Sequence, residues 1–240
     1  MKKFWRWLFG FISFLTLAPY FLWALLHLLG PYWQQREVMR QVTRGFQLAK
    51  QRAASAALDT LLHEGDLIFQ TSLSAQSQAI RLATHSPYSH GGLLYKSGGE
   101  WQVFEAVQPV KLTPLARWVA RGQGGHFVVK RLRDAATVLT PAALARLRAA
   151  GQPLLGHDYD LAFNWSDKQV YCSELIWKVY DRGLHRQLGQ LQHLRDFDLG
   201  HPAVQAKLRE RYGAQLPLAE PVISPASIFN SPALVTVVRR

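Results

Sequence analysis

The sequence of 240 residues contains a single cysteine, Cys172. One cysteine excludes internal disulfide bonds, Cys-x-x-Cys redox chemistry and cysteine-rich zinc sites. Acidic residues are also scarce, with 16 Asp and Glu against 28 Lys and Arg, so the formal net charge at pH 7 is +12. That charge indicates either a solvated basic surface or an anionic neighbour such as phospholipid headgroups. No basic run is interleaved with stacking aromatic residues, which argues against nucleic acid as a partner.

Charged residues are missing from one long stretch near the N-terminus. Between Trp7 and Gly30 the chain has no Asp, Glu, Lys or Arg, and as a helix this stretch could cross a hydrocarbon core of about 30 Å. The run is longer than the apolar region of a cleaved signal peptide and has no small-x-small exit. We therefore predict an uncleaved membrane anchor in residues 1–33, a helical stalk in 34–62 and one folded domain in 63–240.

Basic residues near the anchor bear on its orientation. Lys2, Lys3 and Arg6 precede the apolar stretch and favour a cytoplasmic N-terminus. Arg36 and Arg40 follow it and weaken that preference. We expect the N-terminus inside and the folded domain outside the cytoplasm.

The segment that begins at Cys172 has the pattern of a helix packed on a core. Apolar residues fall at Leu175, Ile176, Val179 and Tyr180, which lie on one helical face. Cys172 is then near the helix N-terminus, where unpaired N–H groups and the helix dipole stabilise a thiolate, the nucleophilic form of the side chain. The alternative is that a lone cysteine is only a small buried apolar residue.

Two predicted strands supply partners for this thiol. A strand follows Tyr88 and carries His90, residues 97–99 (Ser-Gly-Gly) predict a hairpin turn, and the next strand carries Glu105 in an apolar row. A buried carboxylate needs a partner, and His90 on the neighbouring strand is the natural one, unless Glu105 lies on an exposed edge. His85 is a rival base, but it lies near a helix end, where we expect solvent exposure.

Four segments together resemble a known family: Gly65–Ser72, Thr84–Gly92, Phe104–Val107 and Tyr171–Leu175. They are similar to the YiiX/YebB-like group of circularly permuted papain-like enzymes in the NlpC/P60 superfamily. The resemblance runs from about Gly65 to the C-terminus and leaves out the predicted anchor and stalk. It implies an α+β fold, in which helices pack on a small antiparallel sheet or half-barrel and the nucleophile begins a helix.

The resemblance also implies chemistry. Cys172 would be the nucleophile, His90 the base and Glu105 the third polar residue, in agreement with the pairing argued above. The implied reaction is hydrolysis of an amide bond, in a peptide or cell-wall peptide, through a thioester, without metal or cofactor. With the predicted anchor, this implies a single-pass inner-membrane protein whose domain lies on the periplasmic side.

Further residues are candidates for binding the substrate. The backbone N–H of Cys172 could hold the oxyanion together with Tyr88 or Tyr171, between which the sequence does not decide. Asp160 and Asp167 could contact the substrate, although both could equally be loop caps.

Two other functions remain open. A lipid-directed acyl hydrolase or acyltransferase would suit the anchor and the basic surface, and a non-catalytic binding protein could share the fold. The residues that line the site would indicate which class of substrate the protein acts on. An apolar groove beside Cys172 would favour a lipid, whereas a polar cleft with a carboxylate for an amine would favour a peptide.

Overall fold

The computed structural model describes residues 36–37, 39–46 and 56–240. The predicted anchor in 1–33 and much of the predicted stalk in 34–62 lie outside these residues, while 36–37 and 39–46 are helical. In the described ranges no helix is long and apolar enough to cross a membrane. The chain divides into two compact units, Met1–Thr60 and Leu61–Arg240, and the sheets belong to the second.

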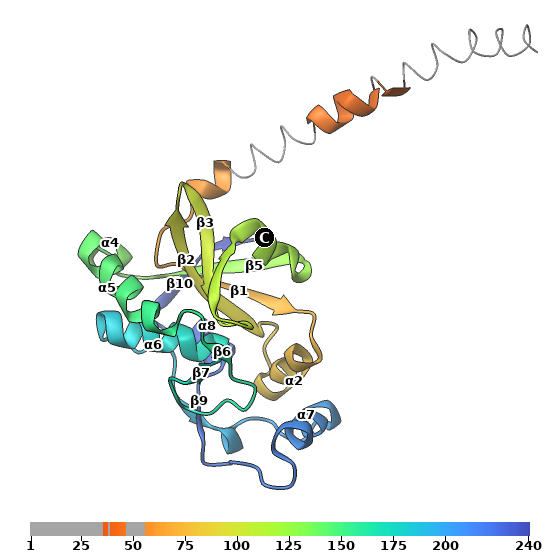
Figure 1. The fold of residues 1–240 in the computed structure, drawn as a ribbon, viewed down its shortest axis with the longest axis vertical. Helices are drawn as coiled ribbons and strands as arrows, with labels where there is room; N and C mark the ends of the chain where they lie inside the picture. Colours follow the sequence, from red (N-terminus) through yellow and green to blue (C-terminus); the bar gives the residue numbers. More distant parts are fainter. Residues whose placement is uncertain (1–35, 38, 47–55) are drawn as a thin grey trace, which may run out of the picture. The chain divides into compact units, whose positions relative to one another are not determined.

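A six-stranded antiparallel sheet forms the centre of the second unit (Figure 1), with the strand order β10-β5-β1-β2-β3-β4. Its strands are β1 (Leu67–Ser72), β2 (His90–Ser97), β3 (Glu100–Glu105), β4 (Lys111–Pro114), β5 (Gly122–Leu132) and β10 (Leu234–Arg239). Two small sheets pair β6 (Asp158–Tyr159) with β7 (Gln169–Val170) and β8 (Gln192–His193) with β9 (Pro221–Val222). The order places β1 and β3 on either side of the strand that begins with His90.

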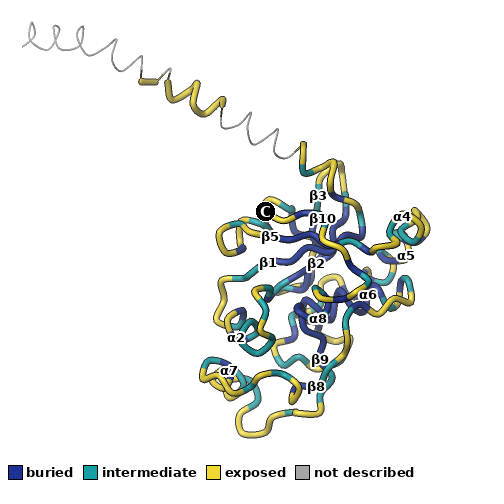
Figure 2. The backbone as a smooth tube through the Cα atoms, turned by 180° about the vertical axis from the view of Figure 1, so that it is seen from behind, coloured by how far each residue is buried: buried dark blue, intermediate teal, exposed yellow. Residues whose placement is uncertain are grey.

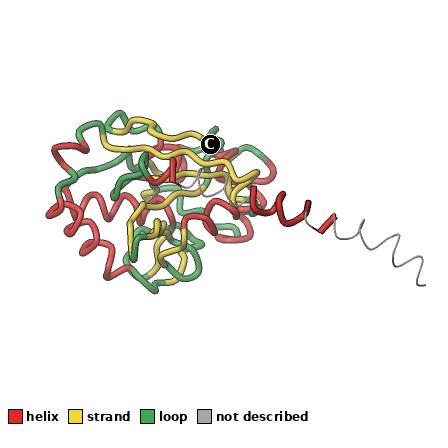
Figure 3. The backbone as a smooth tube through the Cα atoms, turned by 90° about the horizontal axis from the view of Figure 1, so that it is seen from above, coloured by secondary structure: helices red, strands yellow, loops and turns green. Residues whose placement is uncertain are grey.

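Helices flank this sheet (Figure 3) and complete the α+β architecture. They are α2 (Ala75–Thr84), α3 (Leu115–Ala120), α4 (Ala135–Val138), α5 (Pro141–Gly151), α6 (Cys172–Leu184), α7 (Pro202–Tyr212) and α8 (Pro225–Phe229). Helix α6 packs on β2 and β3 and is itself covered by α5 and α8, whereas α3 packs on β3, β4 and β5, and α2 packs on α7.

Short polar residues start several helices. Ser74 accepts a hydrogen bond from the backbone N–H of Ser77, and Thr140 and Ser224 cap α5 and α8 in the same way. The hairpin turn between β2 and β3 is confirmed, because Gly98 and Gly99 have φ of 58° and 83°. Local sequence signals therefore fix the ends of the elements around the site.

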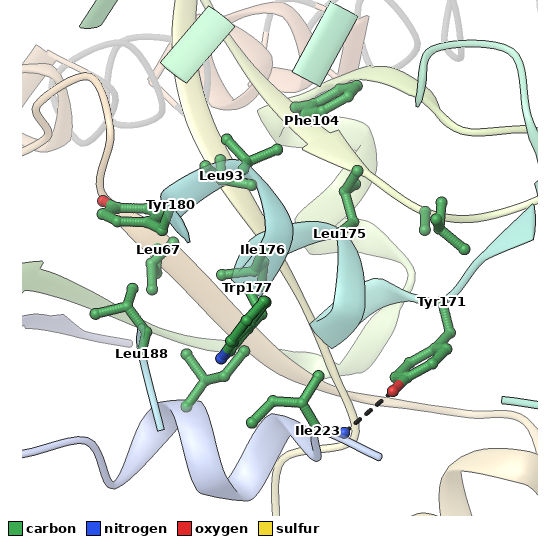
Figure 4. Close-up of a cluster of buried hydrophobic side chains, with 14 of the residues drawn as sticks. Leu67, Leu93, Phe104, Tyr171, Leu175, Ile176, Trp177, Tyr180, Leu188 and Ile223 are labelled. Carbon is green, nitrogen blue, oxygen red and sulfur yellow. Dashed lines mark hydrogen bonds between the residues drawn. The ribbon is translucent and has the colours of Figure 1, made fainter. Parts of the chain in front are cut away.

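The core lies between the sheet and α6 (Figure 4). Leu175, Ile176, Val179 and Tyr180 are fully buried, as the one-sided pattern predicts. Each such side chain contributes roughly 1.5–3 kcal/mol when it leaves water. Figure 2 shows the central strands dark blue along most of their length, whereas Val204 alone is buried on α7. The first residue of α6 is therefore held against the most deeply buried part of the domain.

Two consecutive glycines let β2 approach its neighbours closely. A Cβ at Gly92 would lie 2.5 Å from Val103 and 2.7 Å from the carbonyl oxygen of Phe104. A Cβ at Gly91 would lie 3.2 Å from Ile176 on α6. The glycines after His90 thus allow β3 on one side and α6 on the other to come within reach of the histidine.

Candidate active site

Cys172 is the first residue of α6 and is nearly fully buried, with 2% of its surface exposed. The preceding Tyr171 is extended, and its backbone N–H donates to Glu174 Oε2 at 3.2 Å. The Ser173 hydroxyl donates to the carbonyl oxygen of Ile223 at 2.8 Å, which ties the first turn to a remote segment. The sequence-based position of Cys172 at a helix N-terminus is confirmed.

The surroundings of Cys172 favour the thiolate. Burial alone would raise the pKa of the thiol, but the hydrogen bond with His90 and its positive charge outweigh burial and lower this pKa. The Gly91 backbone N–H adds a further hydrogen bond to the sulfur. The positive end of the α6 dipole acts in the same direction. The cysteine is therefore more than a small apolar residue.

His90 joins the thiol to the carboxylate. Its Nε2 lies 2.6 Å from Glu105 Oε2, which leaves Nδ1 as the ring nitrogen for Cys172. The ring stacks on Trp118 of α3, with 6.0 Å between centroids. Burial would lower the pKa of His90, but hydrogen bonds with Cys172 and Glu105 raise it to about 9. Both shifts favour the thiolate–imidazolium form of the pair over the neutral form.

Glu105 is fully buried at the end of β3 and accepts three hydrogen bonds. Besides His90, Thr113 Oγ1 donates to Oε1 at 2.6 Å and Arg121 Nη2 donates to Oε1 at 2.5 Å. Burial would raise the pKa of Glu105, but His90, Thr113 and Arg121 together lower it. Sequence reasoning found the pairing of Glu105 with His90 and missed the other two donors, which come from β4 and the end of α3.

Replacing Glu105 by glutamine removes the charge that holds the imidazolium. We expect kcat to fall on the order of 10²-fold, because a ring that is poorly oriented transfers protons inefficiently. Labelling of Cys172 by a thiol reagent should persist at a reduced rate, since His90 is still present. Steady-state kinetics and labelling on the same preparation measure both effects. If Glu105→Gln keeps the parental kcat, Glu105 does not orient the His90 ring.

The pH profile of kcat/KM should report the same pair. Catalysis by this pair would need a deprotonated Cys172 and a protonated His90. Because the pKa of His90 is raised to about 9, the rate should hold through neutral pH and fall as pH rises through about 9. Because the pKa of Cys172 is lowered, the acidic limb should lie below the usual range of a thiol. A profile that rises with pH up to about 8.5, as free thiols ionise, would contradict the ion pair.

The other residues proposed from sequence have different surroundings. The Tyr171 hydroxyl accepts a hydrogen bond from the Ile223 backbone N–H at 3.1 Å, as Figure 4 shows. The Tyr88 hydroxyl accepts one from Arg239 at 3.2 Å, and its ring packs at a tilt of 31° on that of Phe229. Both tyrosines therefore have structural partners of their own. His85 is at the end of α2, where its side chain is 75% exposed and lies 3.2 Å from Asp198.

Asp160 is buried in the loop before α6 and accepts a hydrogen bond from the Ala162 backbone N–H at 2.7 Å. Burial raises the pKa of Asp160 against the opposing effect of these loop N–H groups. Asp167 instead pairs with Lys178 and Arg182, which lower its pKa to about 2. These contacts are those of loop-stabilising residues, the alternative that the sequence leaves open.

Tyr159 lies close to the thiol and is not among the site residues predicted from the sequence. Burial raises its pKa well above the usual value, and the negative charge of Cys172 adds to the effect. Its hydroxyl accepts a hydrogen bond from Gln76 Nε2 at 2.9 Å, so its own proton can be donated elsewhere. The pairing of β6 with β7, which places Tyr159 beside Val170, is a contact between two-residue strands that no sequence pattern marks.

Two cavities adjoin the pair. The polar cleft, of about 410 Å³, is lined by residues that include Gln70, Ser77, Ser89, His90, Arg121 and Tyr159. The apolar hollow, of about 90 Å³, is lined by residues that include Ala79, Ala83, Cys172, Val204, Leu208 and Ile223. Gln76 and Ile80 of α2 belong to both linings. The thiol residue and the imidazole thus open onto different cavities.

Sheet, helix and residue order place the chain in the class of papain-like cysteine hydrolases in which the histidine precedes the cysteine. The chain belongs to the family of permuted papain-like amidases, YaeF/YiiX (C92 family), whose model matches residues 61–238. It is accordingly a cysteine amidase or peptidase, and the resemblance seen in the sequence is confirmed.

Relatives support this assignment. The chain is 49% identical over 175 residues to the uncharacterized protein YiiX of Escherichia coli (strain K12). The aligned region covers 73% of this chain and 85% of that protein. It is also similar to the crystal structure of a protein described as the metalloprotein yiiX from Escherichia coli O157:H7. That comparison has a TM-score of 0.71 and 48% identity, and covers 74% of this chain and 97% of the other.

Proposed function

We propose that this protein is a membrane-anchored cysteine amidase that cleaves its substrate through a thioester on Cys172. The observation that carries the proposal is the position of His90, which interacts with Cys172 and whose Nε2 lies 2.6 Å from Glu105 Oε2. Nucleophilic catalysis by a thiol needs a thiolate, a base within hydrogen-bond reach and a group that orients the base. The three side chains supply these parts.

The first half-reaction forms the thioester. The Cys172 thiolate attacks the carbonyl carbon of the amide, and the negative charge moves to the carbonyl oxygen. The Cys172 backbone N–H and the hydroxyl of Tyr159, which lies close enough to Cys172 to feel its charge, would donate to that oxygen. As the tetrahedral intermediate collapses, the carbon–nitrogen bond breaks and the His90 imidazolium gives its proton to the leaving amine.

The second half-reaction consumes water. Neutral His90 takes a proton from a water molecule as the water oxygen attacks the thioester carbon. The carboxylic acid leaves, and the thiolate–imidazolium pair is restored. Glu105 stays ionised throughout, because its role is to fix the ring and stabilise its charged form. The lowered pKa of Glu105 supports this role.

An apolar acyl group suits the hollow beside Cys172. The hollow is lined mainly by aliphatic and aromatic side chains of α2, α7 and the segment around Ile223. Its volume of about 90 Å³ is below the roughly 150 Å³ of an apolar cavity that binds benzene. A short or slender aliphatic group therefore fits. This observation favours an acyl chain or an apolar residue on the carbonyl side, and with it the lipid-directed function as a second candidate.

Filling the hollow should discriminate between acyl groups. In Ala83→Leu we expect KM for a butanoyl amide to rise about tenfold relative to an acetyl amide, since one methylene in a pocket is worth about 10- to 200-fold. Ala116→Leu makes the same change on exposed α3 and serves as the control. Equal effects on both substrates would show that the hollow does not bind the acyl group.

The location of the domain remains part of the proposal. The predicted anchor supports a single-pass inner-membrane protein with the domain in the periplasm, near cell-wall peptides and lipids. Protease added to spheroplasts, in which the inner membrane is intact, should degrade the domain. Protection of the domain until the membrane is dissolved would place it in the cytoplasm.

One relative is described as a metalloprotein, which raises the question of a metal here. Among the described residues no group of three or more His, Cys, Asp and Glu side chains is placed to hold a metal ion. The residues present thus do not fit a metal site, and no step of the mechanism passes through one.

Product profiling tests the function directly. The full chain and its Cys172→Ala variant are incubated with cell-wall peptides and with fatty acyl amides, and new amines and carboxylic acids are identified. We expect products that require Cys172, from one of the two substrate sets. Absence of product from both sets would contradict both proposed substrate classes.

A further inference from the structure

Arg121 lies in the polar cleft and has more hydrogen-bonding capacity than Glu105 uses. Its Nη2 donates to Glu105 Oε1 at 2.5 Å, and 44% of the side chain is exposed. A guanidinium carries five N–H donors in a planar fork that matches a carboxylate. Donors on the solvent side of Arg121 are therefore accessible to a ligand in the cleft.

Two basic residues line the cleft, and the carboxylate that both contact lies behind them. None of the described residues that line it is an aspartate or a glutamate, whereas His90 and Arg121 are both present. Glu105 lies behind them, fully buried and shared by its three donors. Asp158 accepts a hydrogen bond from Gln108 of the lining but is not itself part of it. An anionic group therefore fits this cleft better than an amine.

The two cavities distinguish the two sides of the scissile bond. The acyl carbon becomes bonded to Cys172, which lines the apolar hollow, and the leaving nitrogen receives its proton from His90, which lines the polar cleft. The amine half of the substrate therefore lies in the cleft that contains Arg121.

We infer that the substrates carry a carboxylate on the amine side of the amide bond, as in acyl amino acids or a peptide cut before its last residue, and that Arg121 binds this carboxylate. The inference rests on the proposed function. The acyl group passes to Cys172, the amino acid leaves with the proton from His90, and water then releases the acid. Arg121 takes no part in these transfers and acts as a specificity-determining residue.

A matched pair of substrates tests the inference, with release of butanoate as the readout. N-butanoylglycine carries the carboxylate, and N-butanoylglycinamide has an uncharged amide in its place. We expect the full chain to prefer the carboxylate in kcat/KM by at least about tenfold, and Arg121→Gln to abolish the preference. Arg121→Lys should keep part of it, since the charge remains while the fork is lost.

The control is Arg117→Gln, which removes the same charge from an exposed position of α3 outside the cleft lining and should keep the preference. Loss of orientation at Glu105 would slow both substrates equally, so the ratio isolates binding of the carboxylate. An unchanged ratio in Arg121→Gln, or no preference in the parent, would overturn the inference.

Labelling by iodoacetamide separates failure of the inference from failure of the proposed function. Rapid labelling of Cys172 at pH 6 together with no preference for N-butanoylglycine would overturn the inference alone. Slow labelling at pH 6, with a pH dependence like that of an ordinary thiol, would overturn the proposed function and the inference with it.

Discussion

Replacing Cys172 by serine should lower turnover by at least about 10⁴-fold, because loss of the nucleophile removes the whole covalent pathway. The neighbouring imidazolium stabilises a thiolate, and a serine hydroxyl ionises far less readily. The exchange of sulfur for oxygen at a buried position should cost only about 1 kcal/mol of unfolding free energy, or a few degrees in Tm. The measurement is kcat with the amide found by product profiling.

A folded control accompanies this variant. Cys172→Ala should be equally inactive and should keep the near-ultraviolet circular dichroism of the parent, since Leu175 and Ile176 still hold α6 on the sheet. Because the sequence has one cysteine, no other thiol can take over the reaction. Turnover of Cys172→Ser within tenfold of the parent would place the chemistry on another residue.

Replacing His90 by alanine should lower kcat/KM by about 10³-fold or more, since general acid–base catalysis alone is worth about 10²–10⁴-fold. The variant loses the base, the proton donor for the leaving amine and the cation that lowers the pKa of Cys172. The fold should survive, because Thr113 and Arg121 still pair with the buried Glu105.

His85→Ala is the matched control for the histidine. Its side chain is exposed and pairs with Asp198, so the parental rate should be kept. A large loss in His85→Ala with normal turnover in His90→Ala would reverse the assignment of the base. Both rates are measured in the same assay as for Cys172→Ser, with Tm recorded for each variant.

The positions of Cys172, His90 and Glu105 could be anticipated because local patterns determine them. The one-sided apolar spacing after Cys172 places it at a helix start. The Ser-Gly-Gly turn at 97–99 folds β3 back on β2, and alternation then puts Glu105 on the same face of the sheet as His90. The three sit on regular elements whose periods can be counted along the chain.

The surroundings of these residues could not be anticipated, because they depend on contacts between distant segments. Arg121 reaches Glu105 only because α3 packs against β3 and β4. Tyr171 is adjacent to Cys172 in sequence, yet its hydroxyl faces Ile223. The apolar hollow is assembled from segments that include α2, α7 and residues 222–225. No local sequence pattern in any of these segments predicts that they lie together.

The pairing of Cys172 with His90 can be measured through the pH dependence of alkylation of Cys172 by iodoacetamide, in the full chain and in His90→Ala. Every labelled molecule reports this thiol, since the chain has no second cysteine. If His90 stabilises the thiolate, the parent is labelled fast at pH 6, and in His90→Ala the rate rises only as pH approaches the ordinary thiol pKa of about 8.5. Two superimposable curves, both rising near pH 8.5, would contradict a thiolate stabilised by His90.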